Sequence, residues 1–172
     1  VRGLAVLSDD QVLVADKWNH VVRMISVNGA GTNGSVATFA GSGENRSEDG
    51  VGTDASFLFP ECLASGREAV LVTERHTHAV RKMALSTRTV TTAAGAAWEP
   101  GFVDGPASEA RFYSPGEMAV LPCGATLVCD EGNRRLRLLS ADGATVGTLA
   151  GSDARHPIDD PIDGIGTAAA FS

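Results

Sequence analysis

The stretch Val12-Leu13-Val14-Ala15-Asp16-Lys17-Trp18-Asn19-His20-Val21-Val22-Arg23 decides the fold, because it occurs three times in the chain. It returns as residues 70–81 and again as residues 126–137. In each copy an apolar run ends in an acidic residue, and an arginine follows seven positions later. These recurring pairs are Asp16 with Arg23, Glu74 with Arg81, and Asp130 with Arg137. A repeat of this length indicates stacked copies of one supersecondary unit.

The sequence around this stretch repeats as well. Each copy is followed by an Ala-Gly pair, an Asp-Gly pair and an Ala-x-Phe segment. Cutting after these segments gives three units, 1–59, 60–114 and 115–172, which account for all 172 residues. So many anchor points in one register predict three copies of the same unit.

Each unit has the pattern of four short strands. In the first unit we expect them near residues 3–7, 12–15, 21–27 and 36–40, with a tight corner at residues 16–19. The chain has 20 glycines and only 5% aromatic residues, and it lacks long helical periodicity, which excludes a helical bundle. Four short strands repeated radially form the blade of a β-propeller, so we predict an all-β fold of three antiparallel four-stranded blades.

A family resemblance follows from the same residues. The string Leu-Ala-Val…Leu-Val-Ala-Asp-x-x-Asn-His-x-Val-Arg…Ala-Gly resembles the NHL repeat, and the resemblance covers all 172 residues. The connection Asp-Gly…Ala-x-Phe-x-x-Pro resembles the longer NHL variety. The resemblance implies a propeller of NHL blades, commonly six to a ring. Three blades are then half of a ring, which either the remaining blades of a longer chain or a second copy would complete.

The charge of the chain narrows the classes of partner. Its 14 Lys and Arg residues against 21 Asp and Glu residues give a net charge of −7, which argues against nucleic-acid binding. The inter-blade connections, residues 41–59, 95–114 and 151–171, hold eleven acids and three arginines. We therefore expect an acidic loop face that attracts a basic partner, although solubility alone also explains acidic loops.

Other motifs exclude further classes. No apolar run is long enough to span a membrane. The three cysteines, Cys62, Cys123 and Cys129, form neither a CxxC pair nor an even disulfide framework, and the cell compartment stays undetermined. No nucleophile elbow is present, and no catalytic residue is predicted.

The candidate binding residues are those that break the repeat or gather on the loop face. Trp18 lies at the tip of a corner where the other units have His76 and Gly132, and exposed asymmetric aromatics often anchor a partner. The predicted partner-binding set is Trp18, Lys17, His76, Trp98, Asp49, Asp104 and Asp163. The recurring Asp/Glu and Arg pairs obey the repeat, so we expect them to stabilise the blades.

Metal binding is the weaker interpretation. His20 and His78 recur at one repeat position, which favours local hydrogen bonding over the three or four converging ligands that zinc needs. We predict no metal site and no cofactor. Calcium stays open as an alternative, because acids cluster in two connections (Glu48, Asp49 and Asp54; Asp159, Asp160 and Asp163), but without the spacing of a strong calcium loop.

The sequence thus predicts a non-catalytic propeller scaffold that binds a protein or a small ligand through its loop face. Two alternatives remain open. One is a metal-dependent lyase or hydrolase whose site is completed by other blades. The other is RNA binding through a basic patch on the opposite face, around Arg134 and Arg135.

Overall fold

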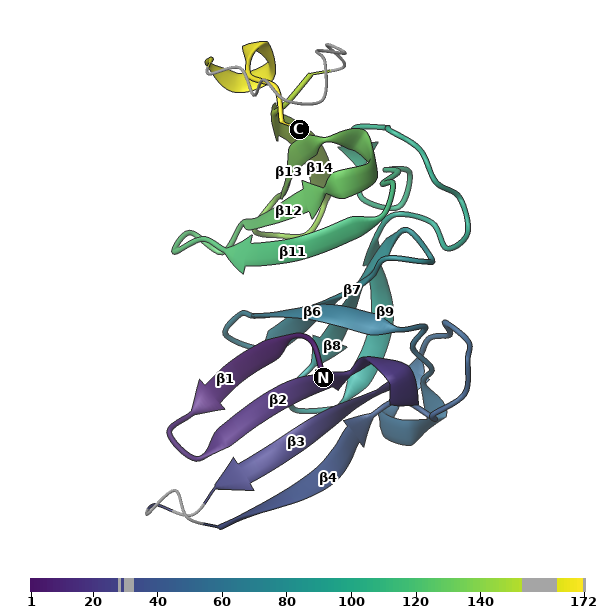
Figure 1. The fold of residues 1–172 in the computed structure, drawn as a ribbon, viewed down its shortest axis with the longest axis vertical. Helices are drawn as coiled ribbons and strands as arrows, with labels where there is room; N and C mark the ends of the chain where they lie inside the picture. The colour runs from purple at the N-terminus through teal and green to yellow at the C-terminus, as the bar shows by residue number, and fades with distance from the viewer. Residues whose placement is uncertain (28, 30–32, 153–163, 172) are drawn as a thin grey trace.

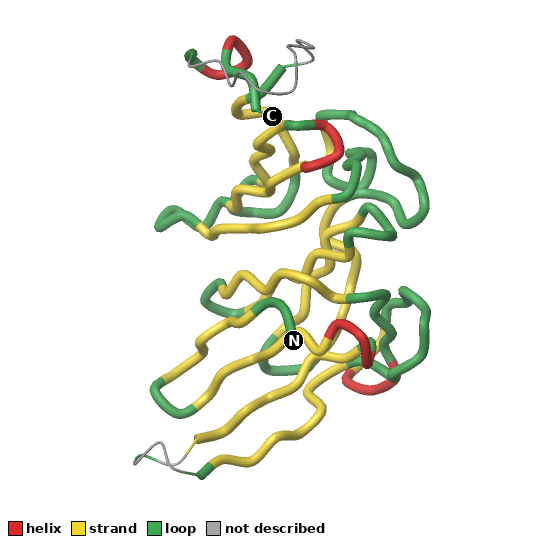
Figure 2. The backbone as a smooth tube through the Cα atoms, viewed as in Figure 1, coloured by secondary structure: helices red, strands yellow, loops and turns green. Residues whose placement is uncertain are grey.

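The computed structural model describes residues 1–27, 29, 33–152 and 164–171. Within these residues the chain forms three antiparallel β-sheets, which follow one another along the long axis of the molecule (Figure 1). Helical structure is limited to short 3-10 turns (Figure 2). The prediction of an all-β fold made of propeller blades is confirmed.

The first sheet, blade 1, has its strands in sequence order. They are β1 (Leu4–Ser8), β2 (Gln11–Asp16), β3 (Val21–Val27) and β4 (Gly34–Ala40), which agree with the four expected strands. The expected corner between β2 and β3 is the 3-10 turn η1 (Lys17–Asn19), and it ends at His20 in the left-handed backbone region, with φ of 58°. The corresponding turn in the third unit ends at Arg134 in the same conformation.

Blades 2 and 3 repeat this arrangement with one strand more. Blade 2 contains β6 (Pro60–Ser65), β7 (Ala69–Glu74), β8 (Ala79–Ala84) and β9 (Thr89–Ala94), and blade 3 contains β11 (Pro115–Val120), β12 (Thr126–Asp130), β13 (Arg135–Leu139) and β14 (Thr145–Ala150). The fifth strands are β5 (Gly50–Val51), which pairs with β9, and β10 (Gly105–Pro106), which pairs with β14. The sequence did not predict them.

Each added strand comes from the connection that leaves the preceding unit. The connection therefore crosses to the outer edge of the next sheet before the chain enters that sheet's innermost strand. In Figure 1 the first two connections (residues 41–59 and 95–114) and the corners η1 and η3 (Glu131–Asn133) lie on one side of the molecule, and the short turns such as that between β1 and β2 lie on the other. We call these two sides the connection face and the turn face.

The core consists of two apolar layers between neighbouring blades. Leu13, Val22, Phe39, Phe57, Val70, Val72, Met83 and Val90 are buried between blades 1 and 2, and Val80, Ala94, Phe112, Val128, Leu139 and Val146 between blades 2 and 3. Phe57 and Phe112 come from the two Ala-x-Phe segments, and both are completely buried. The repeated connection therefore supplies one phenyl ring to each layer.

The inner strands approach one another closely. Strands β1 and β2 contact β6, and β6 and β7 contact β11. A Cβ atom placed on Gly3 would lie 2.6 Å from the carbonyl oxygen of Glu61, so only glycine fits there without a shift of the backbone. Among the described residues, no helix is long and apolar enough to cross a membrane.

Candidate binding surface on the connection face

The recurring acid and arginine of blades 2 and 3 form buried ion pairs. Arg81 Nη1 lies 2.9 Å from Glu74 Oε2, and Arg137 Nη1 lies 2.7 Å from Asp130 Oδ2. At most 1% of each of these four side chains is exposed. Burial raises the pKa of Asp130, while hydrogen bonds from Asn133, from the Tyr113 N–H and from Arg137 act in the opposite direction. A buried charge of this kind needs its partner, because leaving either group alone is costly.

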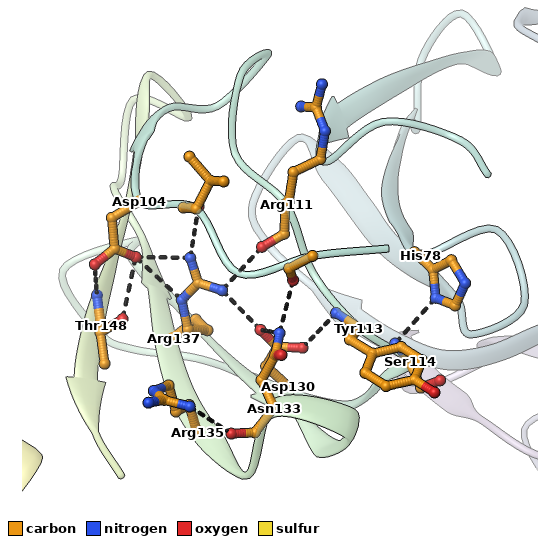
Figure 3. A network of polar contacts seen from close by, with 12 residues as sticks. His78, Asp104, Arg111, Tyr113, Ser114, Asp130, Asn133, Arg135, Arg137 and Thr148 are labelled. Carbon is orange, nitrogen blue, oxygen red and sulfur yellow. Dashed lines mark hydrogen bonds and ion pairs between the residues drawn. The ribbon is translucent and has the colours of Figure 1, made fainter. Parts of the chain in front are cut away.

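Each buried arginine also binds the Asp of the Asp-Gly pair in the preceding connection. Arg81 Nη2 lies 2.7 Å from Asp49 Oδ1, and Arg137 Nη2 lies 2.6 Å from Asp104 Oδ1. Figure 3 shows Arg137 between Asp104 on one side and Asp130 on the other. The arginine therefore joins two repeat units.

The surroundings of Asp104 complete this contact. The amide and hydroxyl of Thr148 both donate to the Asp104 carboxylate, at 3.1 Å each. Arg137 also donates to the carbonyl oxygens of Val103 and Arg111 in the same connection, at 2.8 and 3.0 Å. The carboxylates of Asp49 and Asp104 thus point to the next blade, and Asp163, the third member of this set, lies outside the described residues.

Blade 1 has a less complete version of this network. Arg23 Nε lies 3.3 Å from Asp16 Oδ2, and Arg23 Nη1 donates to Thr38 Oγ1 at 2.6 Å. The exposed fractions of the Arg23 and Asp16 side chains are 34% and 20%. Among the described residues, no connection carboxylate reaches Arg23 as Asp104 reaches Arg137.

The recurring histidines link each corner to the connection that follows it. His20 Nδ1 accepts a hydrogen bond from the Phe59 amide at 3.3 Å, and His78 Nδ1 accepts one from the Ser114 amide at 3.1 Å. Burial, helped by the charge of neighbouring His76, lowers the pKa of His78. Only a ring without a proton on Nδ1 can accept there, so the lowered pKa favours the neutral form of His78 that makes this hydrogen bond.

An aromatic cluster lies on the connection face between blades 1 and 2. The Trp18 ring meets the Phe59 ring edge-on, with centroids 5.4 Å apart, and Phe59 lies 5.1 Å from His76 and 4.5 Å from His20. The corners of two blades and the connection between them all contribute to it. We call Trp18, Phe59, His20 and His76 the aromatic patch, and its most exposed ring is Trp18, at 73%.

Two other predicted residues adjoin the aromatic patch. Lys17 is buried and forms an ion pair with Glu61 at 3.0 Å, and its Nζ lies 5.9 Å from the Trp18 ring centroid. Trp98 is 63% exposed, and its amide donates to the carbonyl oxygen of Thr77, which follows His76 in the chain. The structure thus brings Trp18, Lys17 and His76 together and places the Trp98 backbone beside them.

Several connection acids are paired with arginines. Arg46 pairs with Glu44 and with Glu48, and Arg111 lies 2.7 Å from Glu99. Together with Asp49 and Asp104, these pairs engage five of the acids that the sequence placed on the loop face. Among the described residues, no group of three or more His, Cys, Asp or Glu side chains is arranged to hold a metal ion. The acids Asp159 and Asp160 of the calcium alternative, like Asp163, lie outside those residues.

Cys62 lies between blades 2 and 3. It is buried, and its sulfur accepts a hydrogen bond from the Met118 amide at 3.3 Å. Burial raises the pKa of this thiol to about 12. Such a thiol is packed as an apolar group and is chemically unreactive.

A groove on the turn face separates blades 2 and 3. It has a volume of about 750 Å³ and is lined by the turns that follow β6, β11 and β13. Leu71, Val120 and Leu139 contribute apolar surface, and charged side chains of both signs, such as Lys82 and Asp142, line it too. Sequence analysis did not predict this groove, because its residues come from turns far apart in the chain.

Two members of the aromatic patch, His20 and Phe59, are absent from the predicted partner-binding set, and Phe59 was not named at all in the sequence analysis. Phe59 connects Trp18 to His76, and the position is serine in the second unit, at Ser114. Like Trp18 it breaks the repeat, so the same criterion applied to the connections would have found it.

The comparisons with known proteins support the fold. No protein-family profile matches the chain, and no curated protein sequence matches it. A solved protein of unknown function from Bacteroides thetaiotaomicron is 19% identical with a TM-score of 0.67, covering 80% of this chain and 32% of its own. An auxiliary nutrient binding protein from the same organism is also 19% identical with a TM-score of 0.66, covering 81% of this chain and 35% of its own.

A third similar structure is a nidogen/laminin complex, at 12% identity and a TM-score of 0.58, with coverage of 87% of this chain and 52% of that one. The chain thus spans about a third of the length of the first two structures. Identities this low relate the folds and not the functions. The chain has the fold of β-propeller-like proteins.

Proposed function

We propose that the chain is an NHL-type propeller segment that works as a non-catalytic binding scaffold, and that the aromatic patch on its connection face contacts a basic partner protein. The observation that carries this proposal is the cluster of Trp18 with Phe59 and His76, in which Trp18 is 73% exposed. A large ring held in place by neighbouring rings offers contact area at low entropic cost. An exposed group of neighbouring apolar rings often marks an interaction site, whereas a single exposed apolar side chain does not.

The charge around the patch favours a cationic partner. The chain carries a net charge of −7, and its connections hold most of the acids. Trp18 offers an aromatic face on which a lysine or arginine side chain of the partner can lie. Lys17 does not oppose this, because its ammonium group is neutralised by Glu61 at 3.0 Å.

The similar structure described as a nutrient binding protein is compatible with a binding role, but the likeness concerns the fold. The proposal depends on this chain's own residues. Asp49 and Asp104 take part in it indirectly, because their carboxylates fix the connections that carry Phe59 and Trp98.

An array of short peptides tests the proposal. The array contains sequences rich in lysine and arginine, and the same sequences with every basic residue replaced by glutamine. We expect the labelled chain to bind a subset of the basic peptides, and Trp18→Ala to lose about tenfold or more in affinity, the effect of removing an aromatic anchor. The matched control is Val103→Ala, which truncates an exposed side chain in another connection. The proposal would be overturned if Trp18→Ala bound the basic peptides as tightly as the natural chain does, or if the glutamine peptides bound as tightly as the basic ones.

A further inference from the structure

One broad face of blade 1 is exposed although the same repeat positions are buried in blade 2. This outer face, which points away from blade 2, is formed by Leu4, Val6, Val12, Arg23, Val36 and Thr38. Leu4 and Val36 are 61% and 64% exposed, whereas their counterparts Leu63 and Val90 are 5% and 0% exposed, because blade 1 covers them. Val6 adds a further 66% exposed side chain. An apolar strand surface of this kind is normally covered.

The outer face also carries the two residue types that hold a carboxylate in blade 3. In blade 3, Arg137 and Thr148 together hold the Asp104 carboxylate of the preceding connection. The residues at these positions in blade 1 are Arg23 and Thr38, which are paired across β3 and β4 as Arg137 and Thr148 are paired across β13 and β14. Arg23 and Thr38 can therefore both donate to an incoming Asp carboxylate. In this structure the Arg23 guanidinium donates to the Thr38 hydroxyl instead.

The two filled examples define what fits this face. The occupant has an Asp-Gly pair that reaches the arginine, then an Ala-x-Phe segment whose ring packs against the guanidinium, as Phe112 does at 5.1 Å from Arg137. The third connection has this sequence, with Asp163-Gly164 followed by Ala169 and Phe171. Its described part is uncovered: Ile165 is 94% exposed and Phe171 46%, whereas Phe57 and Phe112 are completely buried.

We propose that the outer face of blade 1 binds the third connection of a second copy of this chain. Asp163 of the second copy would form an ion pair with Arg23, and Phe171 of the second copy would pack in a new apolar layer against the outer face. The charges are complementary, an arginine on one surface and a carboxylate on the other. Two such contacts related by a two-fold axis join two chains head to tail and close a ring of six blades. This proposal does not depend on the aromatic patch, which lies on the connection face between blades 1 and 2.

Light scattering over a range of protein concentrations tests the assembly. We expect a mass of twice 17.7 kDa for the chain. Val36→Arg on the outer face should reduce it to one chain, because a charge replaces an apolar contact. Val51→Arg is the matched control, since Val51 is 53% exposed on β5 at the edge of blade 2 and should leave the dimer intact.

A charge exchange tests the Arg23–Asp163 contact. Arg23→Asp alone and Asp163→Arg alone each place like charges in both contacts of a dimer, so each variant should be monomeric. Mixing the two variants should restore the double mass, because both contacts of the mixed dimer then contain one arginine and one aspartate.

A single-chain mass for the natural sequence at every concentration would overturn the proposal. So would a dimer that survives Val36→Arg, a mixture that stays monomeric, or a series of open multimers. Circular dichroism of every variant would show that each remains folded. Peptide binding by a folded monomer would leave the proposed binding function intact while this proposal fails.

Discussion

The carboxylate of Asp104 lies 2.6 Å from Nη2 of Arg137, although the two residues are 33 positions apart and belong to different repeat units. The same relation joins Asp49 to Arg81 at 2.7 Å. Each of these two connections is thus fixed to the next blade by a guanidinium that is itself buried on an acid of that blade. This contact positions the loops of the connection face, so it links the repeat to the proposed binding surface.

Removing the acids of this network should destabilise the chain in a graded way. Asp130→Ala leaves the Arg137 charge buried without its completely buried partner, and we expect a loss of about 3–5 kcal/mol in the free energy of unfolding. Asp104→Ala removes a half-exposed acid and should cost less, about 1–3 kcal/mol. Urea unfolding followed by circular dichroism gives both values.

Glu99→Ala is the matched control for these two variants. Glu99 also binds an arginine, Arg111, at 2.7 Å, but 62% of the Glu99 side chain is exposed. We expect a change of about 0–1 kcal/mol, the range of surface ion pairs. If Glu99→Ala cost as much as Asp130→Ala, burial would not be the cause of the stabilisation.

Acidification should weaken the link between the corner of blade 2 and the connection that leads to blade 3, because this link uses His78. Histidine in an unfolded chain titrates at about pH 6.5, and burial lowers the pKa of His78 in the folded state. The contribution of His78 is therefore fully present above about pH 6.5, and it is lost as the pH falls through the lower folded-state pKa, because the unfolded state takes up its proton first. Protonation at Nδ1 also removes the acceptor for the Ser114 amide.

His78→Asn isolates this effect. Asparagine tolerates the left-handed backbone at this position, where φ is 62°, and its side chain does not titrate in this range. We expect the stability of this variant to fall less steeply than that of the natural chain as the pH is lowered below about 6.5. Identical slopes, measured as unfolding midpoints at several pH values, would show that His78 does not contribute.

The cysteines should differ in reactivity. Cys123 is exposed, whereas Cys62 is buried and its pKa is raised to about 12 by burial. Only the thiolate reacts with iodoacetamide, so at pH 8 we expect labelling of Cys123 and none of Cys62 in the folded chain. Mass spectrometry of the peptides identifies the labelled sites, and labelling in denaturant is the control. Rapid labelling of Cys62 without denaturant would mean that the contact between blades 2 and 3 opens.

The sequence predicted the strands because each unit has the same apolar run ending in an acid. It did not predict β5 or β10, since Gly50–Val51 and Gly105–Pro106 have no strand pattern, and they pair only because the connection crosses the edge of the next sheet. The ion pairs of Asp49 and Asp104 with buried arginines were also not predicted, because they form only where the connection crosses to the next sheet. Trp18 and His76 were named because they break the repeat, but only the structure shows that Phe59 joins them.

The most direct test of the proposed binding surface is to map where a bound basic peptide lies. The chain has two tryptophans, so its NMR spectrum contains two indole N–H signals, which Trp18→Phe and Trp98→Phe assign. On titration with a peptide selected from the array, we expect the Trp18 signal to shift until saturation, while the amides of Gly124 and Gly143 in the turn-face groove do not shift. A bound peptide that shifts those glycine amides and leaves the Trp18 signal unchanged would contradict the proposed binding surface.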